Sequence, residues 1–157
     1  MPYLLDINVL IALAWPNHIH HKLALQWFKK AREDGWATCP VTQSSFVRIS
    51  SNQRIIPEAR SPQAAMEALE KIILIKGHQF LSDDVSILAA PEICRPKIFG
   101  HNQVTDAHLL ALAIRHDHCL ATLDQGVRQL VTAAQAERSV RWIEPLQNPE
   151  GRPPQIG

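Results

Sequence analysis

Short apolar runs alternate along the chain with longer segments in which apolar residues recur every three or four positions. The short runs are typical of buried strands and cover residues 3–5, 36–40, 78–81, 118–122 and 140–143. The longer segments have the periodicity of amphipathic helices and cover residues 8–15, 22–34, 42–50, 62–76, 106–115 and 127–134. The pattern therefore predicts strands joined through helices.

Several residues mark where these helices begin or end. Ser61 followed by Pro62 predicts a helix start, since proline is tolerated at the first helical position. Thr105 is a good N-cap for the helix at 106–115, and Thr42 for the helix that follows the second strand. Pro16 is expected to end the first helix.

Strands that are connected through helices pair in parallel, which predicts an α/β sandwich with a mainly parallel sheet. The length of 157 residues favours one domain, which we place at residues 1–145. Residues 146–157 are rich in proline and poor in apolar side chains, so we expect a disordered tail there.

Composition excludes some classes of protein. No apolar run approaches the ~20 residues needed to cross a bilayer, and the N-terminus lacks the basic start of a signal peptide. Three scattered cysteines are too few for a disulfide framework. We therefore expect a soluble cytoplasmic protein, and the net charge of +1 neither indicates nor excludes nucleic-acid binding.

The candidate chemistry lies in acids at the ends of predicted strands. Asp6 closes the first strand, Asp124 follows the strand at 118–122, and Asp106 lies in the first turn of the helix before that strand. Ligands of parallel α/β sheets bind beyond the carboxyl ends of the strands, so these carboxylates are expected to converge. A divalent cation such as Mg²⁺ or Mn²⁺ would relieve their repulsion.

Each acid taken alone has an ordinary structural interpretation. Asp106 suits a helix N-terminus, where the dipole favours negative charge. Asp124 precedes Gln-Gly and suits a turn. Asp6 differs because its neighbours are almost all apolar, and a buried unpaired charge is costly.

The same residues resemble a known family. Residues 4–11, 104–113 and 120–124 read Leu-Leu-Asp-Ile-Asn-Val-Leu-Ile, Val-Thr-Asp-Ala-His-Leu-Leu-Ala-Leu-Ala and Leu-Ala-Thr-Leu-Asp. In this order they resemble a PIN-domain ribonuclease, specifically a VapC-type toxin of a VapBC toxin–antitoxin pair. The resemblance covers about residues 3–145.

The resemblance implies a three-layer α/β/α sandwich and endonucleolytic cleavage of RNA that depends on Mg²⁺ or Mn²⁺. It implies that Asp6, Asp106 and Asp124 are the catalytic and metal-binding residues. The polar residues expected around them are Asn8, Gln43, Thr105 and Thr122. The expected partners are an RNA substrate, a cognate antitoxin protein and a second copy of the chain.

One departure from the family pattern leaves a second hypothesis open. The family commonly has a further acid, often Glu, after the second strand, and the nearest match here is the neutral Gln43. Glutamine contributes no negative charge, so the alternative is a PIN-like module that binds RNA or a protein without cleaving. A third hypothesis makes Asp6 a covalent phosphoryl acceptor, but Asn8 replaces the second acid of that motif.

Two basic features remain. Histidines at 18, 20 and 21 suit either a solvated loop or an adventitious metal site. Six cations between residues 29 and 60 suit either an RNA path or solvated helix faces. These cations are Lys29, Lys30, Arg32, Arg48, Arg54 and Arg60.

Overall fold

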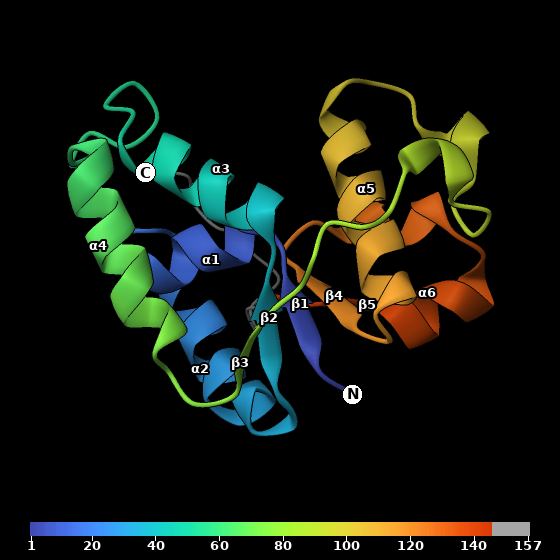
Figure 1. The fold of residues 1–157 in the computed structure, drawn as a ribbon, viewed down its shortest axis with the longest axis horizontal. Coiled ribbons are helices and arrows are strands. Elements are labelled where there is room, and N and C mark those ends of the chain that lie inside the picture. Colours follow the sequence, from blue (N-terminus) through green and yellow to red (C-terminus); the bar gives the residue numbers. More distant parts are fainter. Residues whose placement is uncertain (146–157) are drawn as a thin grey trace, which may run out of the picture.

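The computed structural model of the chain describes residues 1–145, which form a five-stranded parallel sheet with helices on both faces (Figure 1). The strands are β1 (Tyr3–Leu5), β2 (Trp36–Thr38), β3 (His78–Phe80), β4 (Cys119–Thr122) and β5 (Val140–Trp142). Every neighbouring pair is parallel. The predicted tail at 146–157 lies outside the described residues.

Six α-helices connect the strands, together with short 3₁₀ turns in the described part of the chain. The helices are α1 (Ile7–Ala14), α2 (His21–Ala31), α3 (Pro40–Ser50), α4 (Pro62–Ile73), α5 (Asn102–Arg115) and α6 (Ala133–Ser139). The 3₁₀ turns are η1 (Arg32–Asp34), η2 (Ile87–Ala89), η3 (Arg95–Lys97) and η4 (Gln125–Leu130). No helix formed by residues 1–145 is long and apolar enough to span a membrane.

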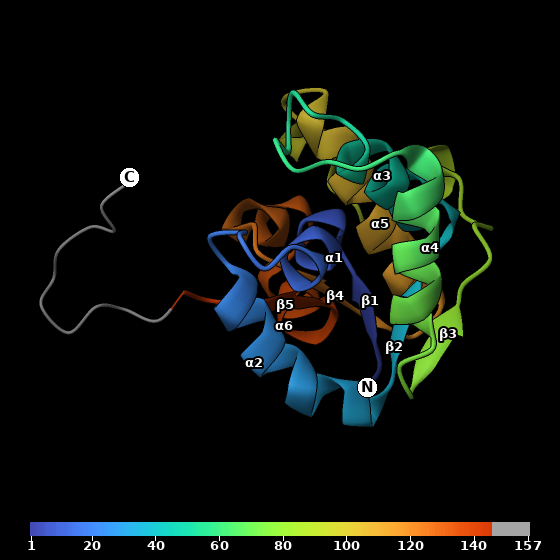
Figure 2. The same cartoon turned by 90° about the vertical axis from the view of Figure 1, so that its left-hand side faces the viewer.

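Successive strand residues point to opposite faces of the sheet, and each face has its own core. Leu4 and Leu120 pack with apolar residues of α5, η4 and α6. Leu5 and Ala121 pack with apolar residues of α1 and with Phe28, on the face where α2, α3 and α4 also lie. Figures 1 and 2 show α1–α4 on one side of the sheet and α5 and α6 on the other, which confirms the three-layer sandwich.

The strand order, β3-β2-β1-β4-β5, positions a candidate site. From β1 the chain moves outward through β2 to β3, then returns to the other side of β1 as β4 and continues to β5. The connections therefore change direction between β1 and β4. In parallel α/β sheets, ligands bind in the crevice outside the carboxyl ends of the strands at such a point.

Three predicted helix boundaries are wrong. The helix predicted from Asp106 begins at Asn102, so Thr105 lies inside α5 and is not its N-cap. Thr42 is also inside its helix, where its hydroxyl accepts the Cys39 N–H at 2.9 Å. The predicted helix at 127–134 is divided, because the Thr132 side chain accepts the Gln135 N–H and starts α6 anew.

The start predicted at Ser61 is confirmed. The Ser61 hydroxyl accepts the Ala64 N–H at 3.1 Å, and Pro62 is the first residue of α4. The three cysteines, all of which lie in the described part of the chain, are free thiols, as expected from their number.

Gly77 supports the start of β2 and β3 in a backbone conformation that other residues avoid. Its φ is +98°, and a Cβ there would lie 2.7 Å from the Arg32 carbonyl oxygen. We predict that Gly77→Ala lowers the free energy of unfolding by about 1–3 kcal/mol. A Cβ at Gly100 meets no atom within 4 Å, so Gly100→Ala is the matched control. Equal denaturant midpoints for the two variants would contradict this account.

Candidate active site at the carboxyl ends of β1 and β4

Asp6 lies at the end of β1 and caps the N-terminus of α1. Its side chain is almost fully buried, at 3% exposure. One carboxylate oxygen accepts the Ile7 N–H at 2.7 Å, and the other accepts the Thr122 hydroxyl at 2.7 Å. Burial raises the pKa of Asp6, the Thr122 and Ile7 hydrogen bonds lower it, and the nearby Asp124 raises it again.

Two polar side chains tie the ends of β1 and β4 together. The Thr122 hydroxyl donates to Asp6 and accepts the Asp124 N–H at 3.0 Å. The Asn8 carbonyl oxygen accepts the Leu123 N–H at 3.3 Å. The structure therefore places Asn8 and Thr122 next to the carboxylates, where the resemblance had put them.

Asp124 follows β4 and caps η4. It is exposed, and its Oδ1 accepts the Gly126 N–H at 2.8 Å. That bond is the turn chemistry expected of Asp-Gln-Gly, and it holds the carboxylate at the sheet edge. The hydrogen bonds of residues 1–145 leave the other oxygen, Oδ2, without a protein partner.

Asp106 is presented from the second turn of α5, on the other side of the same edge. Burial and, to a smaller extent, the negative charges of Asp6 and Asp124 together raise its pKa to about 7. Because the helix begins four residues before Asp106, the dipole of a first turn does not explain this acid. The three predicted carboxylates are thus near enough to destabilise one another's charge.

A cleft of about 370 Å³ opens beside Asp6 and Asp106 between α1, α3 and α5, and Asp124 does not line it. Of the predicted site residues, Asp6, Asn8, Thr105 and Asp106 line it. Four polar residues that the family resemblance had not placed at the site also line it, namely His18, Ser45, Arg48 and Asn102. Among them, Arg48 had been considered only as one of several cations.

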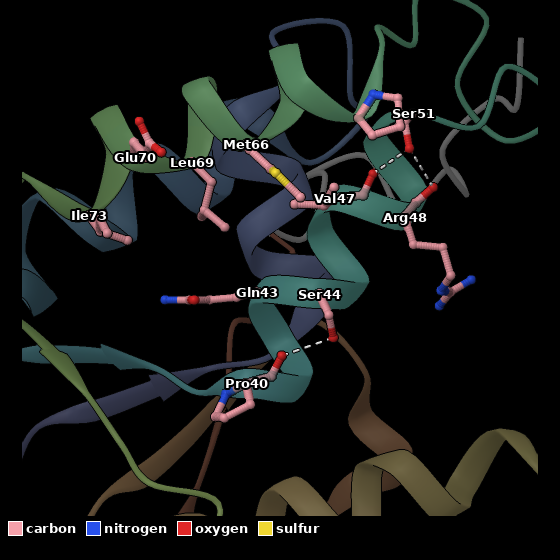
Figure 3. A pocket seen from close by; sticks show the side chains of 11 residues that line it. Pro40, Gln43, Ser44, Val47, Arg48, Ser51, Met66, Leu69, Glu70 and Ile73 are labelled. Carbon is pink, nitrogen blue, oxygen red and sulfur yellow. Dashed lines mark hydrogen bonds between the residues drawn. The ribbon is translucent and has the colours of Figure 1, made fainter.

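The structure does not bring Gln43 to this cleft. The Gln43 side-chain amide donates to the Thr38 hydroxyl at 3.0 Å, and Gln43 lines a separate groove between α3 and α4 (Figure 3). The first residue of α3 that lines the carboxylate cleft is Ser45, two positions later. Helical spacing carries the signal, because Ser45 and Arg48 are three residues apart and share one face of α3.

The donor set suits a hard divalent cation, although the carboxylates do not converge fully. Within residues 1–145, no three His, Cys, Asp or Glu side chains lie close enough together to hold a metal ion. Each carboxylate oxygen has a second lone pair, so the bonds that fix Asp6 and Asp124 leave acceptor capacity. The mutual repulsion that raises the pKa of Asp106 is the interaction that a cation would relieve. Carboxylate oxygens of this kind are ligands that a hard divalent cation prefers.

Other acids and histidines lie outside this cleft. The Asp83 carboxylate contacts the His108 ring at 2.8 Å. Asp84 contacts His116 at 2.8 Å, which lowers the pKa of Asp84. These pairs fasten the segment after β3 to α5.

Comparisons with known proteins identify the family of the chain. A family model described as PIN domain matches residues 3–132. Ribonuclease VapC39 of Mycobacterium tuberculosis is 41% identical over 137 residues, covering 87% of this chain and 99% of the relative. Ribonuclease VapC38 of the same organism is 47% identical over 124 residues, covering 79% of this chain and 86% of the relative.

Two solved structures share the fold at low sequence identity. VapBC2 from Rickettsia felis, bound to a DNA fragment from its promoter, matches with a TM-score of 0.58 and 12% identity, over 83% of this chain and 93% of that one. FitAcB from Neisseria gonorrhoeae matches with a TM-score of 0.59 and 20% identity, over 88% of this chain and 95% of that one. With the family model covering most of the described residues, the chain belongs to the PIN domain family.

Proposed function

We propose that this chain is an endoribonuclease that hydrolyses RNA phosphodiester bonds as the toxin of a toxin–antitoxin pair. The observation that carries the proposal is that Asp106 lies near Asp6 and Asp124 where the sheet connections change direction, with its pKa raised to about 7 by burial and by their charges. The curated relatives that match most of the chain are named ribonucleases, which supports the same activity.

Asp6, Asp106 and Asp124 are the residues that would hold the cation, and Mg²⁺ or Mn²⁺ suits their oxygen ligands. When bound, such an ion polarises the phosphoryl group and favours ionisation of water. We propose that one of these two ions is bound in the active protein.

The protein's own groups orient the reactants. Asp6 is held by Ile7 and Thr122 and acts as a fixed anchor. Asp124 is exposed and has one oxygen without a protein partner, so it orients the attacking water and takes its proton. Thr122 links the two by donating to Asp6 and accepting the Asp124 N–H, so it is a positioning residue.

A PIN-like module that binds without cleaving is the second candidate. The neutral Ser45 supports it, because Ser45 stands where α3 faces the carboxylates and the family pattern commonly supplies an acid after the second strand. Loss of that acid weakens the negative charge available to a cation. The same cleft would then hold RNA or a protein segment without hydrolysis.

The proposed function also implies particular partners and a location in the cell. A toxin of this class needs a cognate antitoxin protein, and the structural similarity to VapBC2 and FitAcB supports such a partner. A homodimer is also proposed. Cleavage of cellular RNA would place the protein in the cytoplasm.

The activity is tested by incubating purified protein with a panel of structured RNAs in Mg²⁺, in Mn²⁺ and in EDTA. We predict metal-dependent cleavage that falls about a hundredfold or more in Asp6→Asn, Asp106→Asn and Asp124→Asn, because each removes a charged ligand. Glu137→Gln removes an exposed acid of α6 and should cleave like the wild type. Cleavage of equal rate in all variants would exclude this site, and binding without cleavage would favour the second candidate.

The role of Thr122 has a conservative test. Thr122→Val keeps the shape of the side chain but removes the hydroxyl that positions Asp6 and Asp124. We predict that it lowers Mn²⁺ affinity about 10–100-fold in calorimetry. Thr122→Ser keeps the hydroxyl and should recover most of the affinity. Equal affinities for the Val and Ser variants would show that the hydroxyl does not position the site.

The raised pKa of Asp106 predicts a pH dependence in metal-free protein. The folded protein binds the Asp106 proton more tightly than the unfolded chain, since the pKa rises from 3.8 to about 7 on folding. Stability should therefore fall as the pH rises from about 4 to about 7. Asp106→Asn should flatten this dependence of the melting temperature. Mn²⁺ should stabilise the wild type more above about pH 7 than below about pH 5, since the ion competes with protons.

A melting temperature whose pH dependence is the same in wild type and Asp106→Asn would contradict the assignment of that proton. Glu137→Gln again serves as the control for loss of an acid elsewhere.

A further inference from the structure

The cleft that Asp6 and Asp106 line also has hydrogen-bond donors from two other parts of the chain. They come from the segment between α1 and α2 and from α3, and they are His18, Ser45 and Arg48. Among the cleft-lining residues that the structure describes, Arg48 is the single Lys or Arg. The cleft therefore holds both carboxylates and hydrogen-bond donors.

The Arg48 guanidinium is available for a ligand. The ion pairs within residues 1–145 are those of His108 with Asp83 and of Arg115 and His116 with Asp84. None of them involves a residue of α3. Among residues 1–145, no side-chain hydrogen bond uses the Arg48 guanidinium; the Arg48 backbone carbonyl accepts the Ser51 hydroxyl. Figure 3 shows the Arg48 side chain extending from α3 away from Met66 and Leu69 of α4.

The hydrogen bond that His18 makes shows which of its two ring nitrogens carries the hydrogen. Its Nδ1 accepts the backbone N–H of His20 at 3.0 Å, and an amide N–H can only donate, so Nδ1 carries no proton. A neutral ring with an unprotonated Nδ1 carries its hydrogen on Nε2. Burial and the neighbouring His20 and His21 lower the pKa of His18, which keeps the ring neutral. The hydrogen bonds of the described residues leave Nε2 without a partner.

We propose that Arg48 and His18 bind a backbone phosphate of the RNA and hold the strand against the carboxylates. Arg48 supplies a charged fork that matches two phosphate oxygens, and His18 Nε2–H supplies a neutral donor beside it. The proposal rests on the ribonuclease function above and names two substrate-binding residues for it.

The charge of the cleft explains why such donors are needed. Asp6, Asp106 and Asp124 repel a polyanionic strand, and a cation among them offsets only the charge nearest to it. The whole chain has a net charge of +1, so there is no strong general attraction for RNA. The positive charge of Arg48 in the cleft fixes where the RNA backbone runs relative to the carboxylates.

The test measures RNA binding separately from cleavage. All variants are made in an Asp106→Asn background, and binding of an end-labelled, single-stranded RNA of mixed sequence is followed by fluorescence anisotropy over a range of salt. We predict that Arg48→Gln weakens binding roughly tenfold and lowers the slope of log affinity against log salt by about 0.7, as expected for one lost phosphate contact. Arg48→Lys should lie in between, because it keeps the charge and loses the fork.

Lys71→Gln is the matched control, since it removes one exposed positive charge from α4, outside the cleft. Arg48→Gln that binds RNA with the affinity and salt slope of Lys71→Gln would overturn the proposal. Cleavage by the protein with the native Asp106 is measured in parallel. If it cleaves RNA while Arg48→Gln binds normally, the proposed function stands and this inference fails. If it neither binds nor cleaves RNA, both fail.

His18 is tested with two amides that mimic opposite sides of the ring. His18→Gln places an amide near the Nε2 position, and His18→Asn keeps only an acceptor near Nδ1. We predict that His18→Gln retains RNA affinity within about twofold while His18→Asn loses about fivefold, the effect of one neutral hydrogen bond. The reverse order, or equal affinities, would remove His18 from the phosphate-binding residues.

Discussion

The site depends on how the buried carboxylate of Asp6 is accommodated. A charged group at 3% exposure is costly unless it is hydrogen-bonded, and here the Ile7 N–H and the Thr122 hydroxyl supply the bonds. These partners belong to α1 and β4, so the same bonds that stabilise the carboxylate fix the helix start and the neighbouring strand end. Asp124 is then positioned by its own N–H on Thr122. One buried acid thereby organises the edge of the sheet where the candidate chemistry lies.

The placement of the carboxylates was predictable because it follows from topology. Apolar runs that end at Asp6 and just before Asp124, joined through helices, imply parallel strands whose carboxyl ends share an edge. The structure has β1 and β4 as direct neighbours, which the sequence pattern alone does not specify. Asp106 was expected at the same edge because the sequence analysis placed it in the first turn of a helix, and that placement is wrong. It lies in the second turn of a helix that starts at Asn102, where the first turn contains no acid.

The positions of the cleft residues His18, Ser45 and Arg48 were harder to predict from the sequence. Gln43 is nearest to the family's acidic position in sequence, yet its amide donates to Thr38, and Ser45 faces the carboxylates instead. A shift of two residues in a helix turns a side chain by about 200°, so an uncertain register decides which residue meets the cleft. His18 lies in an irregular segment between two helices, where periodicity gives no direction at all. Its orientation comes from a single bond to the His20 backbone.

The central claim is that the three carboxylates form one cation site, and diffraction from crystals grown with Mn²⁺ tests it most directly. The account predicts an anomalous peak between Asp6, Asp106 and Asp124, with carboxylate oxygens at about 2.1–2.2 Å, near the distances of small octahedral cations. Asp106→Asn crystals should show a weaker peak at the same place. A peak at the histidines of residues 18–21, or none at the sheet edge while Mn²⁺-dependent cleavage persists in solution, would contradict the account.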